Sequence, residues 1–501
     1  MNNRFRYGFD KLTIELALKL ARGQIKGEIT NEVKTKILKC FDAVKSIVQG
    51  DQLVYSINTG FGSLCSTKIS VKETKILQKN LLKSHSVGVG SPIDKEISKL
   101  MLILKVHTLC FGYSGISLQV IERICWHIEN DYLSLVPEQG SVGASGDLAP
   151  LAHLFLPLIG LGYLTKDGIN YHEAEKILKD HKLEPIELQA KEGLALINGT
   201  QFITAFAIKI AEKFSNCLDH ADLISGLSLD SYLGSFQPFE QKLIELRPHR
   251  GAVIVAERMR KILKDSQLVE SHKDCGRVQD PYSIRCIPQV HGASRDAFYH
   301  FEEKLECELN SVTDNPVIFS KDEIISGGNF HGQPLALPLD YVSLAAAEIG
   351  NISDRRTYLL LEGKWGLPPY LIENAGLNSG FMMTQYVTAA LASENKSMCF
   401  PASADSIPTG GGQEDHVSMG PISARKTLRI IENVEKILAV ELLCAAQAFD
   451  FRKPLKSSRI LEECHKHIRE IIPFIREDTI LSKYINSAIE VIRSKELLKI
   501  A

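Results

Sequence analysis

The residues best suited to unusual chemistry lie in one short turn, Gly140–Pro150. Ala144, Ser145 and Gly146 follow one another in this turn, and Ser145 carries a β-hydroxyl. Glycine allows backbone conformations in which a Cβ atom would clash. If the turn is compressed, the amide nitrogen of Gly146 can attack the carbonyl carbon of Ala144, and loss of water closes a five-membered ring. Loss of the Ser145 hydroxyl then leaves an exocyclic methylidene, which is a strong electrophile.

The same turn also has a simpler interpretation, as a glycine-rich bend before a helix. Asp147 is a good helix N-cap, and Pro150 fits a first helical turn. Free N–H groups at such a helix start favour negative charge. The nucleophile elbow G-x-S-x-G is excluded, because Asp147 stands where its final glycine is required. The turn alone leaves the first two interpretations open.

Two further candidates precede glycine-rich loops. Tyr55 lies in the segment Leu53–Gly62, which is typical of a short strand running into a loop. The two glycines of that loop make only a weak phosphate-binding pattern. His85 precedes the loop that contains Gly88 and Gly90. A packed aromatic residue and a surface histidine are the ordinary structural explanations of these positions.

A second group of polar candidates follows later in the chain. Asn198 precedes a glycine, which by itself is a turn signal. Gln279, Tyr282 and Arg285 are spaced by threes, so near a helical turn they share a face. The Arg285 guanidinium has the planar geometry that binds a carboxylate through two hydrogen bonds. A surface ion pair beside a packed tyrosine would explain the same pattern.

Two candidates remain near the last third of the chain. Phe330 lies in a glycine-rich stretch and could be an ordinary core residue. Glu414 belongs to Gln413–Gly420, a segment that we expect to open a very long helix. Acidic residues at a helix start normally complement the helix dipole. The Pro- and Gly-rich stretch before this segment interrupts the helical pattern.

The elements that must position these residues are mostly helical. Apolar residues recur at helical spacing over most of the chain. We expect helical segments at residues 10–50, 95–130, 154–164, 338–362 and 380–398, from about 205 onward, and after 413. The apolar stripes of the long helices are too extensive for a lone bundle, which indicates association with other chains.

Composition excludes several classes of function. The 501 residues are 44% hydrophobic and 24% charged, as in a globular protein with a large core. A net charge of −2 gives no basic field for nucleic acid or an anionic membrane. The 11 cysteines form no C-x-x-C pair, and no H-E-x-x-H or long apolar run occurs. We therefore expect a cytoplasmic protein without a metal and without nucleic-acid or membrane partners.

The segment Gly143–His153 resembles the signature of the aromatic amino acid ammonia-lyases, and the resemblance extends from about Tyr55 to about Asp450. Those enzymes form a methylidene-imidazolone from Ala-Ser-Gly, which here implies a protein-derived cofactor and no external one. The resemblance also implies a mainly α, L-aspartase/fumarase-like fold. We expect a smaller electrophile-bearing domain at residues 1–220 and a long-helix bundle at 221–501. Family members are homotetramers whose active sites are shared between subunits.

The resemblance further implies catalytic roles, transferred residue by residue. Tyr55 would remove the β-proton of a small amino acid substrate, and a tyrosine needs help because its ordinary pKa is about 10. Tyr282 would assist proton transfer. Arg285 and Gln279 would hold the substrate carboxylate. Asn198 and Asp147 would support the electrophile, with the Asn198 amide placed to hydrogen-bond the ring oxygen.

Three residues bear on substrate specificity by the same resemblance. Phe330 would line the pocket, and His85 belongs to the Ser-His pair of the histidine-specific members. Glu414 lies in Gln-Glu-Asp-His-Val-Ser-Met, which is typical of those members, whereas phenylalanine and tyrosine lyases usually lack this carboxylate. The resemblance thus implies non-oxidative deamination of L-histidine to trans-urocanate and ammonia, the first step of histidine degradation.

Other functions stay open at this point. A tyrosine or phenylalanine ammonia-lyase, or an aminomutase, would use the same electrophile, and Glu414 is the residue that disfavours them. A fumarase-type lyase would carry a Gly-Ser-Ser loop with Met, Pro, Lys and Asn, which the sequence lacks. A catalytically inactive helical scaffold is a third alternative. Gly410–Gly412 and Phe330–Gln333 depart from the family pattern at the pocket flanks, which affects fine specificity more than reaction class.

Overall fold

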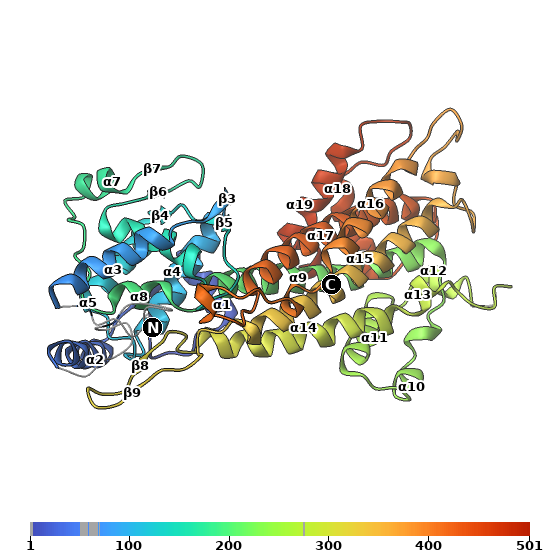
Figure 1. Cartoon of the computed structure of the whole chain (residues 1–501). Coiled ribbons are helices and arrows are strands. Elements are labelled where there is room, and N and C mark those ends of the chain that lie inside the picture. The colour runs from blue at the N-terminus through green and yellow to red at the C-terminus, as the bar shows by residue number, and fades with distance from the viewer. Residues whose placement is uncertain (1–3, 51–58, 60–68, 70, 274–275) are drawn as a thin grey trace. The chain divides into compact units, whose positions relative to one another are not determined.

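The structure is a computed structural model that describes residues 4–50, 59, 69, 71–273 and 276–501 (Figure 1). Long α-helices dominate it and the strands are short, which confirms the mainly α-helical fold class. None of the described helices is long and apolar enough to span a membrane.

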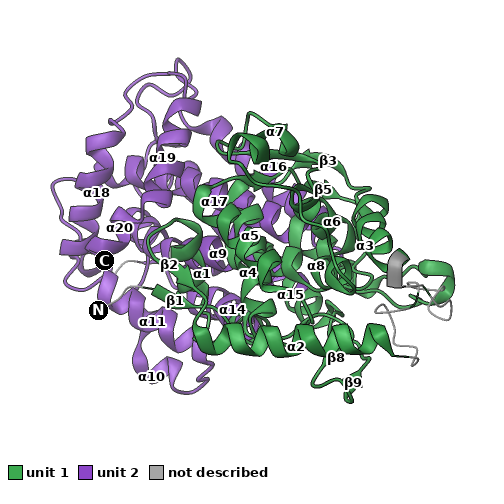
Figure 2. Cartoon of the chain, turned by 90° about the vertical axis from the view of Figure 1, so that its left-hand side faces the viewer, with its two compact units in different colours: residues 1–209, 302–339, 401–425 green, residues 210–301, 340–400, 426–501 purple. Residues whose placement is uncertain are grey.

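The chain divides into two compact units that alternate along the sequence (Figure 2). Unit 1 contains residues 1–209, 302–339 and 401–425, and unit 2 contains residues 210–301, 340–400 and 426–501. Four of the five division points fall within long helices: α9 (Gln201–Tyr232), α14 (Ile287–Leu309), α15 (Gln333–Leu361) and α17 (Gly420–Asp450); the fifth lies between Phe400 and Pro401. The division into domains 1–220 and 221–501 stays a prediction.

Unit 1 combines shorter helices with small sheets. Its helices are α1 (Ile14–Ala21), α2 (Asn31–Gln49), α3 (Val71–His85), α4 (Lys95–Leu109), α5 (Leu118–Asn130), α6 (Leu148–Phe155), α7 (Ala174–Asp180) and α8 (Glu192–Ile197). Its strands are β1 (Arg4–Arg6), β2 (Lys26–Glu28), β3 (Val89–Pro92), β4 (Leu133–Ser134), β5 (Pro137–Gln139), β6 (Tyr163–Thr165), β7 (His172–Glu173), β8 (Val317–Ile318) and β9 (Ile324–Ile325). Strands β1 and β2 pair in parallel, whereas β3–β5, β4–β6–β7 and β8–β9 are antiparallel.

Unit 2 is a helical bundle. Besides its parts of the four long helices it contains α10 (Gln241–Ile244), α11 (Arg250–Ile262), α12 (Gln267–Glu270), α13 (Tyr282–Arg285), α16 (Met382–Met398), α18 (Arg459–Ile471), α19 (Ser482–Ser494) and α20 (Glu496–Ile500). Nearly every residue of α17 between Ile437 and Phe449 is buried. A helix that is buried on all sides forms the centre of a large core.

Charged side chains also lie inside the unit 2 bundle. The buried Arg356 guanidinium donates to both carboxylate oxygens of Glu441, at 2.6 and 3.0 Å. His291 connects Arg356 to a second buried carboxylate, that of Asp222. Such pairs are costly to bury unless every partner is satisfied, so they fix the helices in one register.

The expected helices at 338–362 and 380–398 are confirmed as α15 and α16. The expected helix over 154–164 is wrong. Helix α6 ends at Phe155, and a 3-10 helix, Leu156–Ile159, follows it. Pro157 has no N–H to continue the α-helix, and Gly160 ends the segment at a φ of 78°.

Candidate active site

The turn at Ala144–Gly146 is held in a left-handed conformation. Ser145 has a φ of 48°, and Gly143 and Gly146 have φ values of 85° and 84°. A serine at positive φ is uncommon, because its Cβ approaches the following carbonyl. The predicted backbone bend at these glycines is therefore confirmed, and the residue with the β-hydroxyl occupies its most strained position.

Gly199 clamps this turn through two backbone hydrogen bonds. Its N–H donates to the Ser145 carbonyl at 3.2 Å, and its carbonyl accepts from the Asp147 N–H at 2.8 Å. The approach is close, since a Cβ added to Gly146 would lie 2.1 Å from the Gly199 oxygen. The Asn198-Gly199 pair thus does more than form a local turn: it fixes the backbone on both sides of Gly146.

Asp147 supports a different helix from the one expected. It stands at the N-cap position of α6, but its side chain makes no capping hydrogen bond there. Its carboxylate instead accepts the N–H groups of Phe202 and Ile203, at 2.8 and 3.0 Å, in the first turn of α9. Burial raises the pKa of Asp147 to about 7, against the opposing effects of these two N–H groups and of the Lys105 ammonium. The carboxylate ties the Ser145 turn to the α9 N-terminus.

The segment before α17 packs on the other side of the turn. The Met419 N–H donates to the Val142 carbonyl at 2.9 Å, and Ala144 packs against Val417 and Met419. A Cβ on Gly143 would lie 2.3 Å from Ser418 Oγ, so a side chain there would have to displace this hydroxyl as well as adopt a φ of 85°.

The expectation that Gln413–Gly420 opens a helix is wrong. Helix α17 begins only at Gly420, where Pro421 follows in the first turn, a position that proline favours. Glu414 therefore does not complement this helix's dipole. It pairs with Thr409, whose hydroxyl donates to its carboxylate at 2.9 Å and whose N–H donates to its carbonyl at 2.9 Å.

Asn198 is a buried polar residue that directly precedes Gly199, the residue that holds the Ser145 turn. It is the C-cap of α8, and its side-chain Oδ1 is buried without a hydrogen-bond partner. Its backbone carbonyl accepts from the buried Lys105 ammonium at 2.7 Å. Burial lowers the pKa of Lys105 to about 7, and the carboxylates of Asp314 and Asp147 oppose that shift.

His85 and Glu414, the two residues expected to recognise an imidazole, interact electrostatically. Burial lowers the pKa of His85, and the Leu81 carbonyl and the Glu414 carboxylate both counteract this effect. His85 is the last residue of α3, where Ser84 Oγ lies 3.0 Å from its Nδ1. The structure thus brings these specificity candidates into one neighbourhood of unit 1.

The loop after His85 is attached to the helix that follows the turn. The Gly88 N–H donates to Nε2 of His153, on α6, at 3.0 Å. Phe330 is half-buried in the turn before α15, so it is not a fully buried core residue. Its neighbour His331 stacks on His416 with ring centroids 5.7 Å apart.

The remaining described candidates lie in unit 2. Tyr282 and Arg285 form part of the short helix α13, with the guanidinium 4.4 Å from the tyrosine ring centroid. Arg285 Nε donates to the Asp280 carbonyl at 2.9 Å. Tyr282 is 70% exposed, and Gln279 is exposed ahead of the helix rather than within it. The shared face expected for all three is therefore formed by Tyr282 and Arg285.

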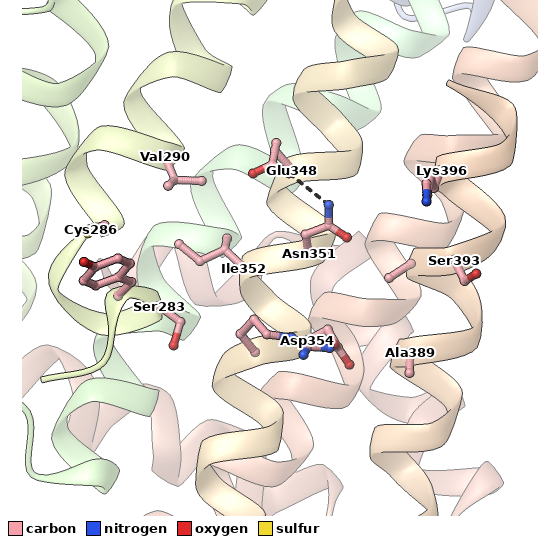
Figure 3. A pocket seen from close by; sticks show the side chains of 13 residues that line it. Ser283, Cys286, Val290, Glu348, Asn351, Ile352, Asp354, Ala389, Ser393 and Lys396 are labelled. Carbon is pink, nitrogen blue, oxygen red and sulfur yellow. Dashed lines mark hydrogen bonds and ion pairs between the residues drawn. The ribbon is translucent and has the colours of Figure 1, made fainter. Parts of the chain in front are cut away.

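A groove lies beside Tyr282 in unit 2. Its walls come from α13 and α14 on one side and from α16 on the other, with Glu348 and Asn351 of α15 along the middle (Figure 3). The side chains of Glu348 and Asn351 are hydrogen-bonded at 2.9 Å. The groove is open at the surface of this chain, so the Tyr282 side chain is accessible from it.

The sequence argument identified Tyr55 but missed three other residues. Tyr55 lies outside the described residues, so its role as a base stays a prediction. Lys105, Gly199 and Ser418 were missed, although each contacts the turn or the peptide next to it. For Lys105 a signal existed, since it is a charged residue within the apolar run Leu100–Leu109.

The long helices place the chain in the L-aspartase/fumarase-like fold class. The family model for aromatic amino acid lyases matches residues 12–470, and the chain belongs to this family. Enzymes of the family use a protein-derived electrophile.

Similar proteins carry several activities in their names. The chain is 46% identical to a histidine ammonia-lyase of Sorangium cellulosum, over 92% of this chain and 91% of that protein. The crystal structure of histidine ammonia-lyase from Trypanosoma cruzi is similar with a TM-score of 0.91 and 39% identity, over 99% and 94% of the two chains. A tyrosine aminomutase from Streptomyces globisporus is similar with a TM-score of 0.93 and 33% identity, over 99% and 98%.

Proposed function

We propose that this protein is a histidine ammonia-lyase, which converts L-histidine to trans-urocanate and ammonia as the first step of histidine degradation. The left-handed Ser145 turn, clamped by Gly199, is the observation that carries the proposal. The names of the relatives at 42–46% identity support histidine as the substrate. So does the electrostatic effect of the Glu414 carboxylate on His85, whose pKa it acts to raise against the larger effect of burial.

The residues of the turn fit the formation of a methylidene-imidazolone. The Gly146 nitrogen bonds to the Ala144 carbonyl carbon, and the Ala144 oxygen leaves as water. The Ser145 Cα proton and hydroxyl leave as a second water, which creates the exocyclic double bond. Gly146 is required because a side chain there would collide with the Gly199 carbonyl. The methylidene carbon supplies the electrophile that makes the substrate amine a better leaving group.

The other residues bind and orient the substrate in this proposal. Arg285 and Gln279 hold the carboxylate, and Tyr55 removes the β-proton with assistance from Tyr282. His85 and Glu414 hold the imidazole, because a carboxylate next to a histidine side chain favours a substrate ring that carries a proton.

Phe330 lines the pocket, and two residues support the electrophile. The Asn198 side chain carries a buried Oδ1 without a hydrogen-bond partner, and its Nδ2 group is the donor that a hydrogen bond to the ring oxygen would need. A side-chain amide in that place can stabilise charge that develops on the ring oxygen. Asp147 holds the turn against α9.

A substrate panel tests the proposal. Purified protein is offered L-histidine, L-tyrosine and L-phenylalanine separately, and the absorbance of the conjugated acid is followed. We expect turnover of histidine alone, loss of turnover in Ser145→Ala, and an intact mass that lacks two water molecules in the wild type only. Turnover of tyrosine or phenylalanine would retain the electrophile and refute the specificity. An undehydrated, inactive chain would instead indicate a helical scaffold.

A second candidate function is an aminomutase, which the likeness to the S. globisporus tyrosine aminomutase favours. An aminomutase returns ammonia to the β-carbon, so its product keeps an amine. Product analysis by mass spectrometry separates the two functions: we expect a deaminated acid and free ammonia. A β-amino acid as the main product would establish the second candidate.

We also propose that the protein is a homotetramer whose active sites are shared between subunits. Along α15 the positions of Tyr341, Leu344, Glu348, Asn351, Arg355 and Tyr358 alternate in steps of three and four. This spacing is that of a helix-packing seam, yet Tyr341, Leu344 and Tyr358 are about half exposed in the single chain. Glu348, Asn351 and Arg355 of this seam also line the groove beside Tyr282. A second copy of the chain packed against α15 would cover both the exposed seam and the groove.

Light scattering tests the assembly. We expect the mass of four chains for the wild type and a smaller species for Leu344→Glu, which places a charge in the exposed seam. A Lys304→Glu variant is the control, at a partly exposed site where Glu303 accepts a hydrogen bond from the Lys304 ammonium, and it should leave the mass unchanged. A wild-type monomer that turns over histidine would refute the shared site.

A cytoplasmic location completes the proposal. Described cysteines such as Cys40, Cys217 and Cys444 carry free thiols in the core. Buried thiols without disulfides suit a reducing compartment. Fractionation of cells that express the tagged full chain tests this, and activity confined to an exported fraction would contradict it.

A further inference from the structure

The apolar helix α4 buries an ammonium group against the end of α8. Lys105 is 1% exposed, and its Nζ donates to the backbone carbonyls of Asn198, at 2.7 Å, and Ala195, at 3.2 Å. These carbonyls belong to the last turn of α8, where unpaired carbonyl groups favour a cation. The contact therefore explains why α8 ends in a fixed geometry next to Gly199.

The peptide that Lys105 contacts is the one that binds Ser145. The Asn198 carbonyl and the Gly199 N–H belong to a single peptide group, and that N–H donates to the Ser145 carbonyl at 3.2 Å. Hydrogen bonds in such a chain polarise one another. The cation withdraws electron density from the Asn198 oxygen, which makes the Gly199 N–H a stronger donor to the Ser145 oxygen.

The position of this cation is costly for a purely structural residue. Its hydrogen bonds go to neutral carbonyls, whereas the nearby Lys191 ammonium lies 2.9 Å from the Asp314 carboxylate. A buried charge that is not in direct contact with an opposite charge destabilises a fold, and an apolar side chain of similar length would avoid that cost. Burial lowers the pKa of Lys105 to about 7, and the carboxylates of Asp314 and Asp147 oppose that shift, so the charged form of Lys105 persists at and below neutral pH.

We propose that Lys105 is a positioning residue of the electrophile, which polarises the Ser145 carbonyl through the Asn198–Gly199 peptide. This inference rests on the proposed function. A polarised Ser145 carbonyl makes the neighbouring Cα proton more acidic, so the Cα proton and the β-hydroxyl leave more readily as water. After ring closure the same oxygen is conjugated with the methylidene carbon, and its polarisation makes that carbon more electrophilic.

The test compares substitutions at Lys105 with a matched one on the same helix. Lys105→Met removes the charge and the donor, Lys105→Gln keeps a donor without charge, and Lys105→Arg keeps both. Lys99→Met is the control, because Lys99 is also a buried lysine of α4 but pairs with Asp131 at 2.5 Å, away from the turn. Each full-length variant is measured by intact mass, by the absorption maximum of the ring, and by kcat and KM for histidine.

We expect Lys105→Met and Lys105→Gln to lower kcat by roughly tenfold or more, as for the loss of a hydrogen bond to a charged group. The absorption maximum of their ring should move to shorter wavelength, because a less polarised carbonyl is conjugated less strongly with the methylidene group. The fraction of chains that have lost two water molecules should also fall. Lys105→Arg should recover the wild-type absorption in part. KM should change less than kcat, since Lys105 does not touch the substrate.

The result that overturns the inference is a Lys105→Gln variant with the absorption maximum, dehydrated fraction and kcat of Lys99→Met. If Lys105→Met does not fold, the comparison of Lys105→Gln with Lys105→Arg decides, and equal absorption maxima and kcat values would overturn it as well. The wild type separates this failure from that of the proposed function. A wild-type chain that is undehydrated or does not deaminate histidine refutes the function itself.

Discussion

Asp147 should destabilise the folded chain at neutral pH, and its neutral analogue should therefore stabilise it. Burial raises the pKa of Asp147 to about 7. In the unfolded chain the pKa of the same carboxyl is about 4. The folded state thus binds the proton more tightly than the unfolded state, so this group's contribution is most favourable below about pH 4 and is lost as the pH rises to about 7.

The size of the effect follows from the two pKa values. A difference of about three pH units corresponds to about 4 kcal/mol, reached in full above pH 7. Asp147→Asn keeps the shape of the protonated carboxyl and can still accept from the N–H groups of Phe202 and Ile203. We therefore expect the variant to exceed the wild type in free energy of unfolding by about 4 kcal/mol near pH 8, and by little near pH 4.

Urea denaturation across this pH range measures the difference. The matched control is Asp314→Asn, a second buried aspartate of unit 1, whose carboxylate lies 2.9 Å from the Lys191 ammonium. There the same substitution leaves a buried cation unpaired and should destabilise by about 3–5 kcal/mol. The reasoning is refuted if Asp147→Asn destabilises the chain near pH 8, or if its advantage does not change with pH.

Three further outcomes are expected. Gly146→Ala places a Cβ 2.1 Å from a carbonyl oxygen, so intact mass should show a chain that keeps both water molecules; a dehydrated variant would contradict this. Arg356→Met leaves the Glu441 carboxylate buried without its cation and should cost about 3–5 kcal/mol in urea denaturation, and a loss below about 1 kcal/mol would be too small for this pair. Co-expressed Ser145→Ala and Arg285→Ala chains, each inactive alone, should regain activity in mixed tetramers; continued inactivity would argue against shared sites.

The helical fold could be predicted from the periodicity of apolar residues, whereas the exact starts and ends of helices were harder to predict. Helices α15 and α16 follow the expected ranges because their apolar positions recur over many turns. The range 154–164 failed because the apolar pattern continues past Pro157, where the α-helix does not. Glu414 was wrongly predicted to lie at a helix start, because an acidic residue ahead of an apolar stripe has the pattern of a helix start, whereas α17 begins only at Gly420.

The site could be predicted in part, because its motif residues are recognisable and their long-range partners are not. The left-handed turn at Ser145 follows from the small residues around it. The partner of the Asp147 carboxylate could not be predicted in the same way. An aspartate before a helix is normally assigned as the N-cap of that helix, whereas the Asp147 carboxylate accepts from the N-terminus of α9. Gly199 and Lys105 act through backbone groups, which leave no pattern in side-chain chemistry.

The contacts of the turn also determine when the ring can form. A serine at a φ of 48° costs of order 1 kcal/mol and persists only where the surrounding structure imposes it. Here it is imposed by Gly199 and Met419, which are distant in sequence. We therefore expect the proposed ring closure to follow the folding of unit 1. In a newly synthesised chain that still carries both water molecules, native circular dichroism should appear before the mass falls by two water molecules, and a mass loss that precedes the native signal would contradict this order.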